Sequence, residues 1–251
     1  MSETETTNAV EFNGVSKSFD KRKVIDELSF KVEAATGYVL LGRSGTGKSV
    51  TLKLICGLLK ADAGTVKVAG TDITAMDSTA LTPLRKNMGF LFQSAALFDS
   101  ISVGANIAFA LQRNTDKSAE EIKERAQAVL DSVGLGKEYD KMPSDLSGGM
   151  RKRAGLARAL ALEPSILLVD EPSAGLDPIT SAEIDDLLLN VKKHDNTTLI
   201  VVTHNIPSAR VLGDRLAFLD NGRILAEGTA EELEQSEHQM VRDFMKSKQG
   251  G

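Results

Sequence analysis

The chain has 251 residues, of which 41% are hydrophobic and 26% are charged, and its net charge is −5. A chain of this length and composition has enough apolar side chains to form a hydrophobic core. Its acidic balance provides no general basic surface for a nucleic-acid backbone, so we expect no nucleic-acid partner. No apolar run reaches the length of about 18 residues that a spanning helix needs. The single cysteine, Cys56, excludes an internal disulfide, and we expect a cytosolic setting.

The N-terminal third predicts strands around one helix. Residues 1–8 are polar and acidic, which predicts a flexible tail and no secretory signal. Apolar and polar residues then alternate in two segments, which predicts antiparallel strands with one solvated face. A short apolar run before a glycine-rich loop predicts a buried central strand, and an amphipathic helix with Gly57 in its last turn follows. The strands are expected at 10–19, 24–32, 38–41, 65–68 and 88–92.

Residues 94–162 are mostly helical in pattern. Ser118 and Glu121 have the spacing of a capping box, and a further helix is expected from Met150 to Leu162. We therefore predict that 94–162 is a helical subdomain inserted into an α/β core of residues 9–93 and 163–251. The expected fold is α/β, with a mostly parallel sheet and an N-terminal antiparallel β-subdomain.

The last third returns to alternating strands and helices. Strands are expected at 166–170 and 198–203, with a helix at about 179–193 between them. The dipeptide Asn221-Gly222 predicts the turn of a β-hairpin. Thr229 and Glu232 have capping-box spacing, which predicts one or two helices at the end of the chain.

The segment 42–49 reads GRSGTGKS and matches the pattern G-x-x-x-x-G-K-[ST] between an expected strand and an expected helix. Its glycines let backbone N–H groups converge on an anion, and the helix N-terminus adds partial positive charge. Lys48 would neutralise the β- and γ-phosphates of ATP, and the hydroxyl of Ser49 would bind Mg²⁺. The residues assigned to the nucleotide here are Gly42, Arg43, Ser44, Gly45, Thr46, Gly47, Lys48, Ser49 and Val50.

A second signal is an apolar strand, 166–169, that ends in two carboxylates. A buried strand brings Asp170 to the sheet edge near the phosphate loop, where it would bind Mg²⁺ or its waters. Glu171 would face the γ-phosphate and act as general base for the attacking water. The alternative, an ordinary acidic strand end, is less favoured beside a phosphate loop.

A third signal lies at the start of the helix near residue 150. Ser147, Gly148 and Gly149 at a helix N-terminus predict a second anion site by the same dipole argument. Taken alone the signal is weak, because such residues also form plain loops and helix caps. Its weight comes from the motifs on either side.

Six motifs follow one another along the chain: residues 42–49, Gln93, residues 146–150, 166–171, 173–177 and His204. In this order they resemble the Walker A, Q-loop, signature, Walker B, D-loop and H-loop of an ABC-transporter ATPase. The resemblance extends from about Phe12 to about Gly228.

This resemblance implies a P-loop NTPase core that hydrolyses ATP as a head-to-tail homodimer, with two permease subunits in the membrane. ATP would lie between the phosphate loop of one copy and Ser147, Gly148 and Gly149 of the other. Phe19 would stack on adenine, unless it is a core residue of an edge strand. Gln93 would report the nucleotide to the permeases from the joint with the helical subdomain. The implied catalytic residues are Lys48, Gln93, Glu171 and His204, and the implied Mg²⁺ residues are Ser49, Gln93 and Asp170.

Finer matches at 92–100, 142–153 and 177–180 resemble the ATPases of Mce-type bacterial phospholipid transporters. Met150 stands where the common ABC signature has glutamine, and is the expected residue in this branch; Phe19 stands where tyrosine is frequent. The branch implies phospholipid transport between bacterial membranes, a position at the cytoplasmic face of the inner membrane, and an Mce-domain substrate-binding protein as a further partner.

The main alternative is the ATPase of an importer for amino acids or another small solute, because none of these residues touches cargo. A soluble ABC protein is less favoured, since translation factors carry two such domains and repair clamps a long coiled coil. A P-loop kinase or GTPase does not account for residues 146–150 and His204. The intact Glu171 argues against a non-hydrolysing sensor.

Overall fold

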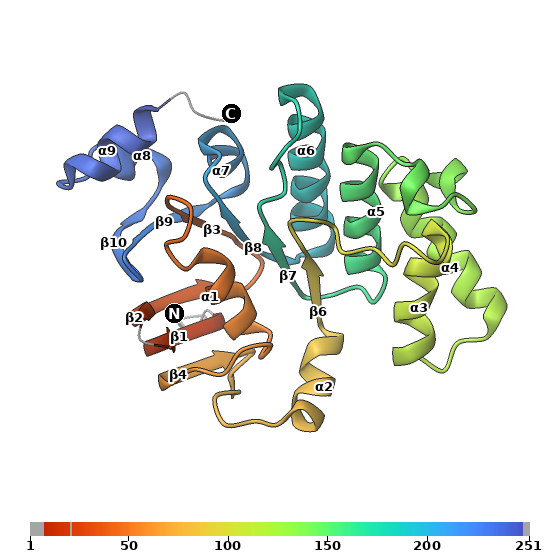
Figure 1. Cartoon of the computed structure of the whole chain (residues 1–251), viewed down its shortest axis with the longest axis horizontal. Helices are drawn as coiled ribbons and strands as arrows, with labels where there is room; N and C mark the ends of the chain where they lie inside the picture. Colours follow the sequence, from red (N-terminus) through yellow and green to blue (C-terminus); the bar gives the residue numbers. More distant parts are fainter. Residues whose placement is uncertain (1–7, 21, 248–251) are drawn as a thin grey trace, which may run out of the picture.

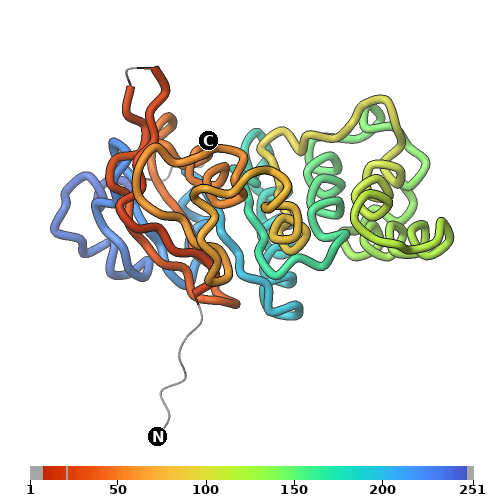
Figure 2. The backbone as a smooth tube through the Cα atoms, turned by 90° about the horizontal axis from the view of Figure 1, so that it is seen from below, coloured from red at the N-terminus to blue at the C-terminus, as the bar shows by residue number. Residues whose placement is uncertain are grey.

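The computed structural model describes residues 8–20 and 22–247. The strands gather at one end of the molecule and the helices of segment 94–162 at the other (Figures 1 and 2). The expected flexible tail falls outside the described residues, except for Asn8, which begins the first strand. Within the described ranges, no helix combines the length and apolarity needed to cross a bilayer.

The N-terminal sheet is antiparallel, with strand order β2-β1-β4-β5. Along β1, Val10 and Phe12 point into the core while Asn13 is exposed, as the alternating pattern predicts. The strands are β1 (Asn8–Phe19), β2 (Arg22–Glu33), β4 (Ala63–Val68) and β5 (Thr71–Asp72). This confirms the expected antiparallel β-subdomain.

The second sheet has six strands in the order β10-β9-β3-β8-β7-β6. All neighbouring pairs are parallel except β9 and β10, which form the hairpin that turns at Asn221-Gly222. The strands are β3 (Gly37–Leu41), β6 (Met88–Leu91), β7 (Ile166–Asp170), β8 (Thr198–Thr203), β9 (Arg215–Asp220) and β10 (Arg223–Gly228). The mostly parallel sheet of the expected α/β fold is thus confirmed.

The parallel sheet separates two hydrophobic cores. Every residue of β3, β7 and β8 is buried, because the sheet is covered on both faces. Alternate residues of β3 serve opposite sides: Val39 and Leu41 pack towards the helices, and Tyr38 and Leu40 towards α1 and the antiparallel sheet. The carboxyl ends of the strands are therefore held from both sides.

The helices differ from the prediction in three respects. The helix after the phosphate loop ends at Ile55, so Gly57 lies beyond it with φ +66° and terminates it, which corrects the expected position in its last turn. The signature helix begins at Gly148, two residues early, and α2, α3 and α7 were not individually expected. The helices are α1 (Lys48–Ile55), α2 (Ser78–Lys86), α3 (Val103–Asn114), α4 (Ala119–Ser132), α5 (Gly148–Leu160), α6 (Pro178–Asp195), α7 (Ile206–Leu212), α8 (Ala230–Glu234) and α9 (Gln239–Lys246).

Candidate functional site

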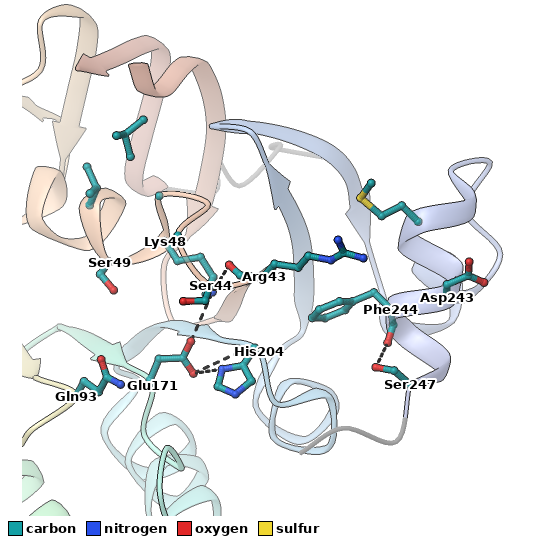
Figure 3. A pocket seen from close by; sticks show the side chains of 15 residues that line it. Arg43, Ser44, Lys48, Ser49, Gln93, Glu171, His204, Asp243, Phe244 and Ser247 are labelled. Atoms are coloured by element: carbon teal, nitrogen blue, oxygen red, sulfur yellow. Dashed lines mark hydrogen bonds and ion pairs between the residues drawn. The ribbon is translucent and has the colours of Figure 1, made fainter. Parts of the chain in front are cut away.

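A cavity of about 880 Å³ lies where the carboxyl ends of β3, β6, β7 and β8 meet. Each of these strands is followed by residues that the sequence singles out, and parallel strands bring such residues to one edge. Figure 3 shows Lys48, Glu171 and His204 converging there. The predicted residues that line the cavity are Arg43, Ser44, Gly45, Gly47, Lys48, Ser49, Val50, Gln93, Glu171 and His204.

Two glycines set the path of the phosphate loop. Gly47 is the N-cap of α1 with φ +108°, and a Cβ there would lie 2.6 Å from the Cδ1 of Ile25. A Cβ on Gly42 would lie 2.4 Å from the carbonyl oxygen of Leu219. The loop is thus pressed against its surroundings at both positions. Gly42 and Thr46 do not line the cavity, but Thr46 Oγ1 donates to the carbonyl of Arg43 at 3.0 Å and closes the loop.

Lys48 is the first residue of α1, and its buried side chain reaches back to the phosphate loop. Its Nζ donates to the carbonyls of Gly42 at 2.8 Å and Arg43 at 3.0 Å, and lies 3.5 Å from Oε1 of Glu171. Burial lowers the pKa of Lys48, and the neighbouring Glu171 carboxylate opposes that shift. An ammonium group that contacts carbonyls and one carboxylate can instead donate its hydrogen bonds to phosphate oxygens.

Ser49 and Asp170 form an oxygen pair beside the loop. Ser49 Oγ donates to Oδ1 of Asp170 at 2.8 Å, and burial raises the pKa of Asp170 against the effect of this hydrogen bond. Hydroxyl and carboxylate oxygens are the ligands Mg²⁺ prefers, together with phosphate oxygens and waters. Among the residues that the structure describes, no group of three or more His, Cys, Asp or Glu side chains could hold a metal. The two oxygens of Ser49 and Asp170 supply part of the coordination of Mg²⁺, so the pair suits an ion that phosphate oxygens and waters also bind.

Glu171 follows β7 in a left-handed conformation, φ +46°, which turns the chain at the end of the strand. Its backbone is fixed on both sides: its N–H donates to the carbonyl of Val202, and its own carbonyl accepts from the buried Nζ of Lys152 at 2.9 Å. Oε2 accepts from Thr203 Oγ1 at 3.1 Å and from the backbone N–H of His204 at 3.3 Å. It also lies 2.9 Å from Nδ1 of His204. The carboxylate is thus oriented by contacts within the protein.

Gln93 enters the cavity from the loop after β6. Ala95 and Ala96 in that loop have left-handed backbone conformations, φ +62° and +49°. The guanidinium of Arg158 donates to both of their carbonyls, at 2.9 and 2.7 Å. Because Arg158 belongs to α5, the segment after Gln93 is tied to the helix that begins at Gly148.

Two predicted groups lie away from this cavity. Ser147, Gly148 and Gly149 do not line it, and Ser147 caps α5 by accepting the N–H of Met150 at 3.2 Å. Phe19 does not line it either; it is the last residue of β1, 41% exposed, with the Nζ of Lys17 at 5.6 Å from its ring centroid. From the antiparallel sheet, Val24 of β2 lines the cavity instead.

Helix α9 forms part of the cavity wall, which the sequence reasoning missed. Val241 and Met245 are buried on one side of α9, and Phe244 packs edge-to-face on Phe218 at 4.9 Å between ring centroids. The amphipathic pattern of residues 239–246 indicates a packed helix, but it does not indicate which surface of the protein that helix covers. The residues of α9 and its C-terminal end that line the cavity are Met240, Asp243, Phe244 and Ser247.

Comparison with known proteins identifies this architecture. A family model described as ABC transporter matches residues 25–174. The chain is 40% identical to the probable ribonucleotide transport ATP-binding protein mkl of Mycobacterium tuberculosis, over 97% of this chain and 68% of that protein. It is 36% identical to the intermembrane phospholipid transport system ATP-binding protein MlaF of Haemophilus influenzae, over 97% of this chain and 92% of that protein.

A solved structure extends the similarity to the whole fold. The ATP-binding cassette MJ0796, in a dimeric post-hydrolysis state bound to ADP and Pi, superposes with a TM-score of 0.82 and 30% identity. The superposition covers 88% of this chain and 98% of that one. The family model alone spans more than half of the chain. The chain therefore belongs to the ABC transporter family and is an ATP-binding, ATP-hydrolysing cassette.

Proposed function

We propose that this cassette powers the movement of phospholipid between bacterial membranes from the cytoplasmic face of the inner membrane. The similarity to MlaF over nearly the full length of both proteins supports the cargo. Within that similarity, the segments 92–100, 142–153 and 177–180 resemble those of Mce-type lipid transporters and support the same cargo. An Mce-domain protein and two permease subunits are its partners in this proposal.

The observation that carries the catalytic part is the oriented carboxylate of Glu171 beside Lys48 and His204. Glu171 is the general base, since it follows the Mg²⁺ carboxylate by one residue and faces the same cavity. Lys48 binds the β- and γ-phosphates in place of the carbonyls it now contacts. His204, on the loop after β8, contacts the γ-phosphate, and Phe19 stacks on the adenine.

Ser49 and Asp170 hold Mg²⁺ in this proposal. Ser49 and Gln93 line the cavity, and Asp170 does not line it but is hydrogen-bonded to Ser49. When bound, the ion neutralises charge on the β- and γ-phosphates. Gln93 also connects the core, 9–93 and 163–251, to the helical subdomain, 94–162. Because Arg158 holds the loop after Gln93 against α5, a shift of Gln93 is transmitted to the helices.

The site is completed by a second copy of the chain. Ser147 and Gly148 are exposed at the N-terminus of α5, which carries partial positive charge. Their position outside the cavity of their own chain is what a head-to-tail homodimer requires. Two ATP molecules are then bound per dimer, each between a phosphate loop and the partner's α5.

Ser147→Arg is expected to lower ATP hydrolysis at least about tenfold, because a long cation at the end of α5 disturbs contact with the partner's γ-phosphate. ATP binding by the isolated chain is expected to stay within about twofold of wild type, since Ser147 is remote from its own cavity. Steady-state hydrolysis and equilibrium binding of a fluorescent ATP analogue measure the two effects. The matched control is Ser144→Arg, also exposed and three residues away. Hydrolysis by Ser147→Arg at the wild-type rate would contradict the composite site.

An exposed aromatic pair on the helical subdomain supports a permease contact. Phe98 and Phe109 are 47% and 37% exposed and pack edge-to-face at 5.2 Å between centroids. Arg113 lies 5.0 Å from the ring of Phe109. Large aromatic side chains left at a surface are typical of protein contacts. Phe98 lies in the segment that follows Gln93, so the proposed contact is connected along the chain to a residue that lines the cavity.

The test of the cargo is to extract the tagged chain from its native membranes and identify the subunits and lipids bound to it. We expect permease subunits, an Mce-domain protein and phospholipid. A variant with Phe98→Asp and Phe109→Asp is expected to hydrolyse ATP but to lose these partners, and it controls for non-specific capture. Recovery of a small-solute-binding protein in place of the Mce-domain protein would contradict phospholipid transport.

The second candidate is the ATPase of a small-solute transporter. It is favoured by the 40% identity to mkl, whose name describes ribonucleotide transport. The proposed residues for ATP are the same in both candidates, so site variants do not separate them. The bound subunits and the extracted ligand do.

A further inference from the structure

Asp185 is a buried carboxylate that the hydrolysis of ATP, as described above, does not use. It lies on α6, 6% exposed, where Ile184 and Leu188 provide the apolar packing. Its Oδ2 accepts a hydrogen bond from Ser208 Oγ at 2.6 Å, and its Oδ1 has no partner among the described residues. Burial raises the pKa of Asp185 to about 6, so it is ionised at neutral pH in a place where charge is costly.

The partner of Asp185 lies in the first turn of α7. Ser208 N–H donates to Oδ1 of Asn205, which caps that helix, at 3.1 Å. Asn205 N–H donates to Thr203 Oγ1 at 3.0 Å, and Thr203 Oγ1 donates to Oε2 of Glu171 at 3.1 Å. A continuous series of hydrogen bonds thus runs from α6 through the start of α7 to the carboxylate of Glu171.

A branch of the same series reaches the loop after β7. Asn205 Nδ2 donates to Ser173 Oγ at 3.2 Å, in the segment 173–177 between Glu171 and α6. Asn205 therefore joins the loop after β7 to the loop after β8, and Ser208 joins both to α6. The two loops and α7 surround a cavity of about 750 Å³ that Asp185 also lines.

We propose that Asp185 is a positioning residue for ATP hydrolysis, which acts through Ser208 and Asn205 to fix the segment 203–205 that orients Glu171. The proposal rests on the proposed role of Glu171 as general base. An ionised acceptor makes the bond to Ser208 shorter and stronger than a neutral pair would. Misplacement of a reacting group by about 1 Å costs about 10²-fold in rate, so a partial loosening of this segment is measurable.

The test is a set of variants of the full chain assayed for ATP turnover. Ser208→Ala removes the hydroxyl and is expected to lower kcat about 3- to 30-fold, with KM for ATP within about twofold of wild type. Ser208→Thr keeps the hydroxyl and is expected to restore most of kcat. Asp186→Asn, the exposed carboxyl next to Asp185, is the matched control and is expected to behave as wild type.

The order of the series gives a sharper test. Asp185→Asn is expected to lower kcat less than Ser208→Ala, because the amide oxygen still accepts a weaker bond. The double variant is expected to match Ser208→Ala alone, since both changes break one connection. If the loss of kcat in the double variant equals the product of the two single losses, or if Ser208→Ala keeps the wild-type kcat, the proposal is overturned. Glu171→Gln separates the two assignments. If Glu171→Gln also hydrolyses ATP normally, the assignment of Glu171 as general base fails; if Glu171→Gln is inactive while the Ser208 and Asp185 variants are normal, only the positioning role fails.

The ionisation of Asp185 is checked by stability. Its folded-state pKa lies above the unfolded value of 3.8, so the native state binds the extra proton and ionisation destabilises the fold as pH rises through about 6. Asp185→Asn is expected to raise the thermal midpoint at pH of about 7.5 and to lose this advantage by about pH 4. Asp186 on α6 and His204 on the loop before α7 line the same cavity. The charge of Asp186 adds to the rise in the pKa of Asp185, so the control for this measurement is Glu124→Gln, at an exposed position of α4. An unchanged midpoint difference between Asp185→Asn and wild type across this range would exclude a buried ionised Asp185.

Discussion

Replacing Glu171 with glutamine is expected to lower ATP hydrolysis by about 10²- to 10⁴-fold, the range for loss of a general base. The amide oxygen still accepts from Thr203 and the backbone N–H of His204, so the side chain keeps its orientation. It cannot take a proton from water. ATP binding is expected to remain, because Lys48 and the phosphate loop are untouched, and the variant is expected to accumulate as an ATP-bound dimer.

The measurements for Glu171→Gln are single-turnover hydrolysis, ATP affinity and the fraction of dimer at saturating ATP. Glu124→Gln, on the exposed face of α4, makes the same chemical change far from the cavity and is the control. Turnover of Glu171→Gln near the wild-type rate would remove this residue as the base. A variant that fails to bind ATP would instead show that Glu171 acts on the ground state through Lys48.

The contacts of Asp170 and Glu171 show how two adjacent carboxylates are accommodated at the site. Two like-charged carboxylates, Asp170 and Glu171, follow each other at the end of β7. Ser49 satisfies the first, and Lys48, Thr203 and His204 surround the second. The free-energy cost of burying these two charges is thus offset by hydrogen bonds and one ion pair.

Most of the strands and the phosphate loop were predicted because each depends on local patterns, whereas the two-residue strand β5 was not. A buried parallel strand reads as a short apolar run, and Gly42–Ser49 is a local pattern whose neighbours on either side also fit. The position of Asp170 and Glu171 at the site followed from a general rule, since the carboxyl ends of parallel strands meet at one edge. These parts needed no knowledge of long-range packing.

The parts that were missed depend on contacts between distant segments. Helix α9 is amphipathic, but only the packing of Phe244 on Phe218 places it beside the phosphate loop. Ser208 and Asp185 are 23 positions apart on different helices, and no periodicity links them. Gly57 was assigned to α1 because a helix C-terminus and a glycine within a helix look alike until φ is known.

Removing the charge of Lys48 is expected to have the largest effect on nucleotide binding. Lys48→Met keeps the aliphatic length of the side chain but leaves the phosphates without their buried cation. Losing one partner of a buried charge pair costs about 2–5 kcal/mol, so ATP affinity is expected to fall at least about 30-fold. The fold is expected to persist, because Arg43 lines the cavity, where a water molecule can replace Nζ as the donor to its carbonyl. Titration of a fluorescent ATP analogue measures the affinity, and the thermal midpoint of the chain without ATP measures the stability of the fold.

Lys60→Met removes a charge from an exposed position and is the control. Affinity within about threefold of wild type in Lys48→Met would show that backbone N–H groups alone bind the phosphates.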